Sequence, residues 1–170
     1  GGGWAAHFNS RKRLPHPDDY ISAVKDLFDE IPITVIAEPG RSLVGNAGIL
    51  VMSVIASNKT PAKCFCIVDA GMNDFIRPPL YGARHRIEPV KYSNRIDVLQ
   101  DVVGPGCESS DFLAKKIKLP VMKKNELLAL FTAGAYGSSM SSNYNSRRKA
   151  AEVAVAKNKV FLIKKRETYD

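Results

Sequence analysis

The order of apolar and polar residues divides the chain into two parts, and the first part has the pattern of helices and a buried strand. Residues 17–29 are predicted to form a helix, because their apolar positions recur on one face. The run ITVIA at 33–37 is continuously apolar, which is typical of a strand buried on both faces. A polar loop, EPGR at 38–41, follows it, and a further helix is expected from about Ser42. A helix, a buried strand and a polar loop in this order are typical of a βα-unit in a parallel sheet or barrel.

From residue 49 onward the pattern is that of an antiparallel β domain. Short apolar segments recur, and Gly, Pro, Asn and Ser separate them. The segments are ILVMSVIA (49–56), CFCIVDA (64–70), RIEPVKY (86–92), RIDVLQDVV (95–103), ELLALFTA (126–133), AAEVAVA (150–156) and KVFLIKK (159–165). We therefore predict two parts that meet near residues 46–50, the first with a βα-unit and the second with an antiparallel β barrel or sandwich.

Composition excludes several classes of protein. Of the 170 residues, 45% are hydrophobic and 25% are charged, which excludes a disordered or fibrous chain. No apolar run approaches the ~20 residues that cross a bilayer, and no secretory signal begins the chain. The three cysteines indicate a reducing, cytoplasmic setting, and we expect Cys64 and Cys66 to be buried or half-buried on one side of a strand.

The charges point to no nucleic acid, membrane or metal partner. The net charge is +8, but the basic residues are dispersed and accompany no nucleic-acid-binding motif. The three histidines are scattered, and the spacing of Cys64 and Cys66 is not the usual one for zinc, so no metal site is predicted.

Four loops carry residue types that active sites use. EPGR at 38–41 holds a glycine whose N–H an anion can approach closely. RPPLY at 77–81 sets an arginine and a tyrosine among prolines, and GPGCESSD at 104–111 sets a cysteine beside a glutamate. AGAYG at 133–137 precedes a stretch rich in Gly, Ser and Asn that holds a second tyrosine. Taken singly, each loop is also typical of a purely structural turn.

Taken together, these loops resemble the motifs of the diaminopimelate decarboxylase family in both order and spacing. The matching segments are EPGRSLVGNAG (38–48), VDAGMNDFIRPPLYGARH (68–85), VVGPGCESSDFLAK (102–115) and TAGAYGSSMSSNYNSR (132–147), and GGG at 1–3 resembles the preceding glycine loop. The family consists of pyridoxal-phosphate enzymes with an alanine-racemase-like fold. The resemblance implies that residues 1–48 are the last two or so units of a (β/α)8 barrel, and that residues 49–170 complete the site and the dimer interface.

The resemblance also implies an activity and a cofactor site. The reaction would be the decarboxylation of meso-2,6-diaminopimelate to L-lysine and carbon dioxide, the final step of lysine biosynthesis. Glu38 would face the pyridine nitrogen of pyridoxal 5'-phosphate and keep it protonated, which makes the ring a better electron sink. The other implied cofactor contacts are Gly2, Gly3, Pro39, Gly40, Arg41 and Tyr136.

The implied substrate contacts suit an amino acid with charges at both ends. They are Arg41, Arg77, Tyr81, Glu108 and Tyr136. Arginine suits this role because its planar guanidinium pairs bidentately with a carboxylate. Glu108 would bind the distal ammonium, and Cys107 would deliver a proton to the α-carbon. In the family these two residues reach into the partner's site, so a homodimer is expected.

Other polar residues of these motifs are predicted to have structural roles. We expect Asp69, Asn73 and Asp74 to end strands and stabilise turns. We expect Asp111 and Asn143 to hydrogen-bond the loops that present the site.

One feature of the family is missing from the sequence. The family attaches its cofactor through a lysine in the first half of the barrel, and none of the lysines here lies in a matching motif. A complete barrel takes ~250 residues, and the first residue is Gly rather than Met. We therefore expect a C-terminal fragment that is inactive alone.

Two alternatives stay open at this stage. One is an ornithine, arginine or carboxynorspermidine decarboxylase of the same fold, against which Glu108 argues because the ornithine enzymes more often have Asp there. The other is a non-catalytic protein that acts as a dimerisation or regulatory partner of an intact decarboxylase.

Overall fold

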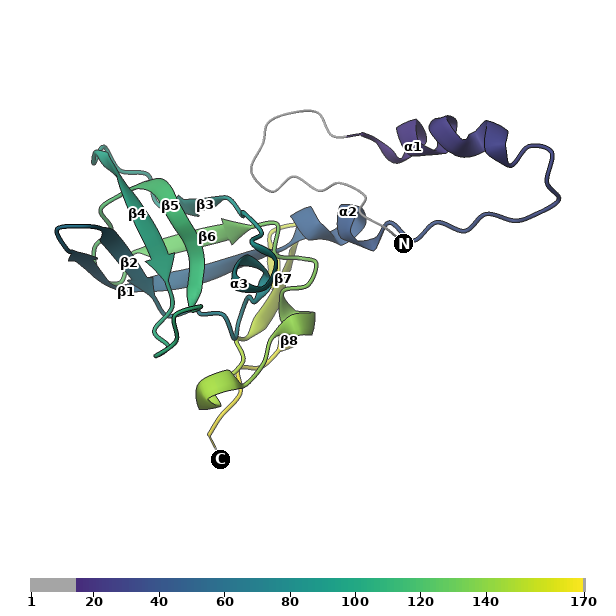
Figure 1. The fold of residues 1–170 in the computed structure, drawn as a ribbon. Coiled ribbons are helices and arrows are strands. Elements are labelled where there is room, and N and C mark those ends of the chain that lie inside the picture. Colours follow the sequence, from purple (N-terminus) through teal and green to yellow (C-terminus); the bar gives the residue numbers. More distant parts are fainter. Residues whose placement is uncertain (1–14, 170) are drawn as a thin grey trace.

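The computed structural model describes residues 15–169, so Gly2 and Gly3 lie outside the described residues. The predicted N-terminal helix is confirmed as α1 (Pro17–Val24), which continues as the 3-10 turn η1 (Lys25–Leu27). A capping box begins it, in which the backbone N–H of His16 donates to the carboxylate of Asp19 at 2.6 Å. Figure 1 shows that α1 lies on an arm that extends away from the β domain.

The predicted strand at 33–37 is wrong. Residues 32–39 form no regular element, and the side chain of Ile36 is 82% exposed. A strand buried on both faces needs a neighbouring strand to take its hydrogen bonds and elements to cover its faces. Within residues 15–48 the structure contains no strand, so ITVIA has neither. The barrel tail expected over residues 1–48 stays a prediction. The helix expected from Ser42 is present as α2 (Gly40–Val44), followed by the 3-10 turn η2 (Gly45–Ala47).

The β domain is built on one curved six-stranded sheet with the order β3-β6-β1-β2-β4-β5. Its strands are β1 (Ile49–Lys59), β2 (Cys64–Val68), β3 (Ile87–Pro89), β4 (Asp97–Val103), β5 (Phe112–Pro120) and β6 (Leu127–Phe131). All pairs are antiparallel except β2 with β4, which are parallel. Because β3 and β5 also contact each other, the sheet is nearly closed into a barrel (Figure 1). A separate hairpin of β7 (Glu152–Ala156) and β8 (Lys159–Lys164) follows.

Strand β5 is the strand that the sequence pattern missed. Its alternation of apolar and polar residues breaks at the exposed pair Lys115 and Lys116, and the backbone of Lys116 has a φ of 53°. The register with β4 shifts at this point, and the carboxylate of Asp101 accepts the N–H of Lys116 at 2.7 Å. The bulge moves later side chains to the other face, so a strict period of two was not visible.

The core lies inside the curved sheet and takes residues from all six of its strands. Its fully buried members include Met52, Val54, Cys66, Val68, Phe75, Val102, Leu113, Leu128 and Leu130. Cys66 is fully buried and Cys64 is half-buried, as predicted. Burial raises the pKa of the Cys66 thiol to about 11, so this thiol stays protonated at neutral pH.

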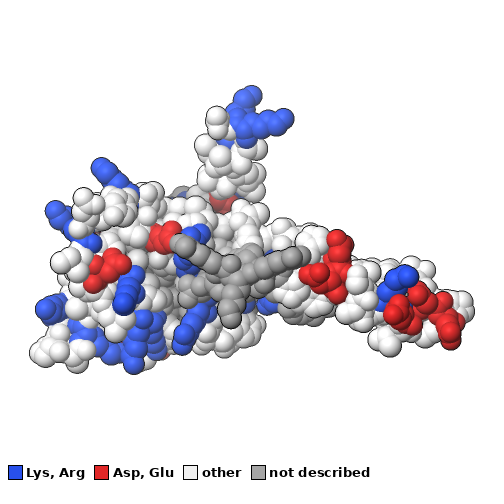
Figure 2. All heavy atoms as spheres, turned by 90° about the horizontal axis from the view of Figure 1, so that it is seen from above, with Lys and Arg blue, Asp and Glu red and all other residues white. Residues whose placement is uncertain are grey.

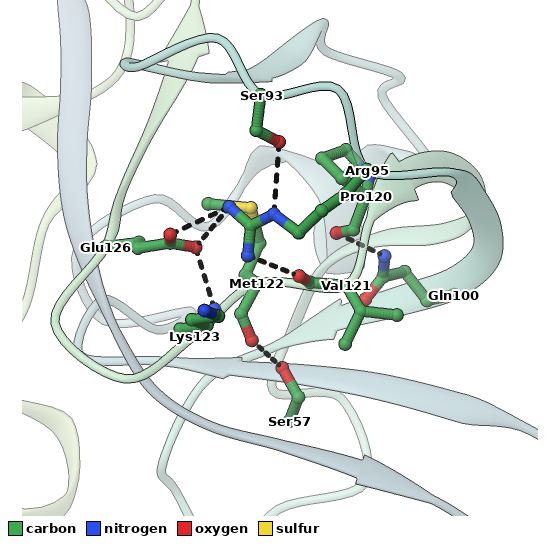
Figure 3. A network of polar contacts seen from close by, with 9 residues as sticks. All are labelled: Ser57, Ser93, Arg95, Gln100, Pro120, Val121, Met122, Lys123 and Glu126. Atoms are coloured by element: carbon green, nitrogen blue, oxygen red, sulfur yellow. Dashed lines mark hydrogen bonds and ion pairs between the residues drawn. The ribbon is translucent and has the colours of Figure 1, made fainter.

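A polar network ties the loop before β4 to the loop before β6 (Figure 3). Arg95 donates two hydrogen bonds to the carboxylate of Glu126, at 2.7 and 2.8 Å, and one to the carbonyl oxygen of Val121 at 2.8 Å. The hydroxyl of Ser57 on β1 donates to the carbonyl oxygen of Met122 at 2.6 Å. These bonds hold the end of the sheet that lies away from α2.

The charged side chains are distributed unevenly between the β domain and the arm. Figure 2 shows basic side chains spread over the β domain on the face drawn, while acidic side chains gather on the arm. Within residues 15–169, no helix has the length and apolarity that crossing a membrane requires.

Candidate functional site

Asp111 joins two of the candidate loops at one buried carboxylate. One oxygen accepts the N–H of Met72 at 2.7 Å, and the other accepts the N–H of Gly106 at 2.6 Å. The side chain is only 6% exposed. A Cβ at Gly104 would lie 2.3 Å from both carboxylate oxygens, so glycine is required where the loop passes over this group. The predicted loop-binding role of Asp111 is confirmed.

Cys107 and Glu108 lie exposed on the loop that Asp111 holds, between β4 and β5. The hydroxyl of Tyr144 donates to the carboxylate of Glu108 at 3.1 Å. This hydrogen bond, with further ones from Ser110, lowers the pKa of Glu108, while the same carboxylate raises the pKa of Tyr144. A residue from the loop at 132–147 therefore directs the carboxylate of Glu108.

Sequence reasoning did not name Tyr144 as a site residue. It lies in the 3-10 turn η4 (Tyr144–Ser146), in the stretch where a second tyrosine was unusual for a linker. That tyrosine was the available signal, but its partner is 36 positions away in the chain.

Arg77 begins the short helix α3 (Arg77–Tyr81), whose first turn holds Pro78 and Pro79. Its side chain is 7% exposed, and its guanidinium carbon lies 5.7 Å from the ring centroid of Tyr136. Burial lowers the pKa of Arg77, and the nearby charge of Arg41 lowers it further, while Tyr136 and Tyr81 act in the opposite direction. The structure thus brings three predicted site residues within electrostatic reach of Arg77: Arg41, Tyr81 and Tyr136.

The loop that carries Tyr136 is fixed against η2 and the start of β1. Ala133 and Gly134 donate their N–H groups to the carbonyl oxygens of Gly48 and Gly45, at 2.9 and 3.0 Å. A Cβ at Gly134 would lie 2.0 Å from the carbonyl oxygen of Val44, so the two segments pack backbone to backbone. Tyr136 itself has a φ of 61°, a left-handed conformation that costs about 1 kcal/mol in a residue with a side chain. The packing therefore sets the position of the ring relative to α2 and Arg41.

The remaining polar residues of the motifs hold the loops, as predicted. The side-chain oxygen of Asp69 accepts the N–H of Ser53 at 2.7 Å, and that of Asp74 accepts the N–H of Gly71 at 2.9 Å. Arg147 donates to the side-chain oxygen of Asn73 at 3.2 Å. The loop at 132–147 is therefore bound to the loop after β2.

Asn143 likewise binds backbone, because its side-chain N–H donates to the carbonyl oxygen of Arg147 at 3.1 Å. Its predicted role is confirmed too.

The predicted site residues fall into two described groups and a third set on the arm. The first group is Arg41, Arg77, Tyr81 and Tyr136, and the second is Cys107 and Glu108 with Tyr144. Glu38 and Pro39 precede α2, and Gly40 begins it. Tyr136 also lines a cavity of about 610 Å³, beside Phe75 and the hairpin residues Glu152 and Lys164.

Comparison with known proteins shows which family this chain is similar to. Residues 19–134 match the family model described as "Pyridoxal-dependent decarboxylase, C-terminal sheet domain". The diaminopimelate decarboxylase of Aquifex aeolicus is 47% identical over 170 residues, which cover 100% of this chain and 40% of that protein. The chain therefore spans less than half the length of this relative.

Solved structures of decarboxylases also align with this chain. The crystal structure of diaminopimelate decarboxylase from Helicobacter pylori complexed with L-lysine aligns with a TM-score of 0.86 and 42% identity, covering 93% of this chain and 39% of that one. The lysine/ornithine decarboxylase of Vibrio vulnificus complexed with cadaverine aligns with a TM-score of 0.74 and 25% identity, covering 84% and 40%. On the family match and these likenesses, the chain belongs to the pyridoxal-dependent decarboxylases and carries their C-terminal sheet domain.

Proposed function

We propose that this chain supplies the C-terminal part of the active site of a diaminopimelate decarboxylase, which converts meso-2,6-diaminopimelate to L-lysine and carbon dioxide. The observation that carries the proposal is the buried guanidinium of Arg77 over the ring of Tyr136, within reach of Arg41 and Tyr81. Such a group of cations and hydroxyls suits a substrate carboxylate. The higher identity to the Aquifex aeolicus enzyme than to the lysine/ornithine enzyme supports the choice of substrate.

The residues around α2 fit pyridoxal 5'-phosphate. Apart from its chain neighbours and the backbone of its own helix, no atom of the described residues lies within 4 Å of the place where a Cβ of Gly40 would be, so a phosphate has room there. Pro39, Gly40 and Arg41 would hold the phosphate, with Gly2 and Gly3 as further proposed contacts. Glu38 would accept a hydrogen bond from the pyridine nitrogen, and the half-exposed ring of Tyr136 would pack beside the cofactor. When bound, the cofactor supplies the electron sink that decarboxylation needs.

The chain's own groups would hold the distal end of the substrate and act at its reacting carbon. Arg41 and Arg77 would bind the distal carboxylate, which L-lysine keeps after decarboxylation, and the Tyr81 hydroxyl would add a hydrogen bond. Glu108, whose carboxylate accepts a hydrogen bond from Tyr144, would bind the distal ammonium. Cys107 would donate a proton to the α-carbon after carbon dioxide has left.

We further propose a homodimer in which Cys107 and Glu108 serve the partner's site. Both residues lie exposed at the tip of a loop, whereas Arg77 is buried. An exposed acid and an exposed thiol at a loop tip can reach a neighbouring subunit, which a two-fold symmetric pair would do twice.

A substrate panel tests the proposed function. The full-length enzyme that contains this chain, purified and loaded with pyridoxal 5'-phosphate, is given meso-2,6-diaminopimelate, ornithine, arginine or carboxynorspermidine, and released carbon dioxide is measured. We expect the highest kcat/KM with meso-2,6-diaminopimelate, because only this substrate carries a second carboxylate with its distal ammonium. A higher kcat/KM with ornithine would contradict the proposal.

Removing the Tyr144 hydroxyl is expected to raise the pKa of Glu108. In Tyr144→Phe the carboxylate loses its strongest hydrogen-bond donor, so its pKa moves up toward the ordinary value. Glu108 attracts the ammonium only while its carboxylate is ionised, and it becomes protonated as the pH falls through its pKa. Because this pKa is higher in the variant, the KM of the variant should begin to rise at a higher pH than that of the wild type when the pH is lowered. Carbon-13 NMR titration of glutamate carboxyls measures the shift directly.

Tyr92→Phe is the matched control, since Tyr92 is an exposed tyrosine on the loop before β4. An unchanged Glu108 titration in Tyr144→Phe would refute the assigned hydrogen bond.

A further inference from the structure

His85 is a buried histidine beside Arg77 that the roles above do not use. It lies between α3 and β3 and is 3% exposed. Its Nε2 is 3.3 Å from Nη1 of Arg77, and its Nδ1 is 2.9 Å from the carbonyl oxygen of Phe131 at the end of β6. The ring packs edge-on against Phe75, with centroids 4.7 Å apart. The imidazole thus spans the distance between the sheet and the guanidinium.

These two contacts determine which nitrogen carries the proton. A carbonyl oxygen only accepts, so Nδ1 must donate to Phe131. A guanidinium only donates, so Nε2 must offer its lone pair to Arg77. The neutral imidazole with its proton on Nδ1 is the form that satisfies both. Burial and the charge of Arg77 also lower the pKa of His85, against the effect of the Phe131 hydrogen bond.

A neutral acceptor at this place has a specific consequence for Arg77. It directs one edge of the guanidinium while adding no negative charge. A carboxylate in the same position would neutralise the guanidinium and compete with a bound carboxylate. His85 on one side and the Tyr136 ring on the other therefore orient the guanidinium, and neither places a negative charge beside it.

We propose that His85 is a positioning residue for Arg77 and sets the direction in which its guanidinium meets the substrate carboxylate. The proposal rests on the proposed function in one respect, that Arg77 binds this carboxylate. It assigns to the neutral Nε2 lone pair a role in substrate affinity, and to the Nδ1–H a role in attaching His85 to the sheet.

Two near-isosteric variants separate these roles. In His85→Gln the amide oxygen replaces Nε2 and can accept from Arg77, whereas the bond to Phe131 is lost. In His85→Asn the amide N–H replaces Nδ1 and can donate to Phe131, whereas the acceptor for Arg77 is lost. We expect His85→Asn to raise the KM for meso-2,6-diaminopimelate by about 10- to 100-fold, with a much smaller change in kcat. His85→Gln should stay within about fivefold of the wild type.

Binding of L-lysine to the holoenzyme, measured by calorimetry, should weaken in His85→Asn and recover in His85→Gln. Equal losses in both variants, or a larger loss in His85→Gln, would mean that His85 acts only through the sheet and would overturn the proposal.

A measurement on the wild type is independent of variant folding and of the substrate. Nitrogen-15 NMR of labelled histidines should find His85 neutral at pH 7, with its proton on Nδ1. A proton on Nε2 overturns the proposal, because that nitrogen could not accept from Arg77. If the predicted tautomer is found but the wild type does not decarboxylate meso-2,6-diaminopimelate, the proposed function fails, while an L-lysine affinity that depends on the Nε2 acceptor still supports the role of His85.

Discussion

Replacing Cys107 with alanine is expected to lower the kcat for L-lysine formation by about 10²- to 10⁴-fold, the usual contribution of a positioned proton donor. The α-carbon needs a proton after carbon dioxide has left, and the thiol of Cys107 is exposed at the tip of the loop between β4 and β5. Alanine leaves this step to water. Initial rates on the purified enzyme measure the effect. Cys64→Ala is the control, because Cys64 is half-buried on β2 and belongs to neither group of site residues. A Cys107→Ala enzyme with a wild-type kcat would remove Cys107 from the mechanism.

The same variant tests whether two subunits share each site. Arg77→Ala should also be inactive, because it lacks the guanidinium that binds the carboxylate. In a mixed dimer of the two variants, one site would contain both altered residues and the other would contain neither. Random exchange of subunits should therefore restore about one quarter of the wild-type activity. No recovery in dimers shown to be mixed by native mass spectrometry would place both residues in one subunit's site.

Replacing Asp111 with asparagine is expected to have the largest effect on stability, about 3 kcal/mol of the free energy of unfolding. The carboxylate accepts two backbone N–H groups, from Met72 and Gly106, and it is almost fully buried. An amide of the same shape would turn its own N–H toward one of these donors and leave that donor unpaired. Urea unfolding of the purified protein measures the change.

Asp111→Asn should also lower the kcat. Gly106 immediately precedes Cys107, and its N–H is one of the groups that Asp111 holds. Release of this bond allows the thiol to move away from its target, so kcat should fall together with stability. Asp97→Asn is the control, since Asp97 is an exposed carboxylate at the start of β4. Equal stabilities of the Asp111→Asn and Asp97→Asn proteins would contradict the role given to the buried carboxylate.

Two errors of sequence reasoning have the same physical origin. ITVIA at 33–37 has the composition of a buried strand, but a strand forms only where another strand takes its hydrogen bonds, and the described residues place none beside it. Strand β5 was missed because the bulge at Lys116 breaks the alternation, and the reason for the bulge is Asp101 on the neighbouring strand. In both cases the partner segment decides the outcome.

In the candidate site, too, some residues were predicted from the sequence and others were not. The motifs predicted Arg41, Arg77, Tyr81 and Tyr136 as substrate contacts, which stays a prediction, and the structure places the other three near Arg77. Tyr144 and His85 were not singled out, although both lie inside quoted motifs. A tyrosine and a histidine carry no sign in their own neighbourhood of the carboxylate or the guanidinium that they contact.

By itself, the sequence determined the residue types that can bind a carboxylate, a phosphate or an ammonium, most strands of the β domain, and the glycines over which backbone can pass closely. Only the tertiary structure decided which of these residues meet. Asp111 binds a backbone group 39 positions away, Tyr144 binds Glu108 across 36 positions, and His85 reaches Phe131 across 46. Local patterns report the periodicity of neighbouring residues, whereas these contacts arise when the sheet closes and brings distant loops to one end of the domain.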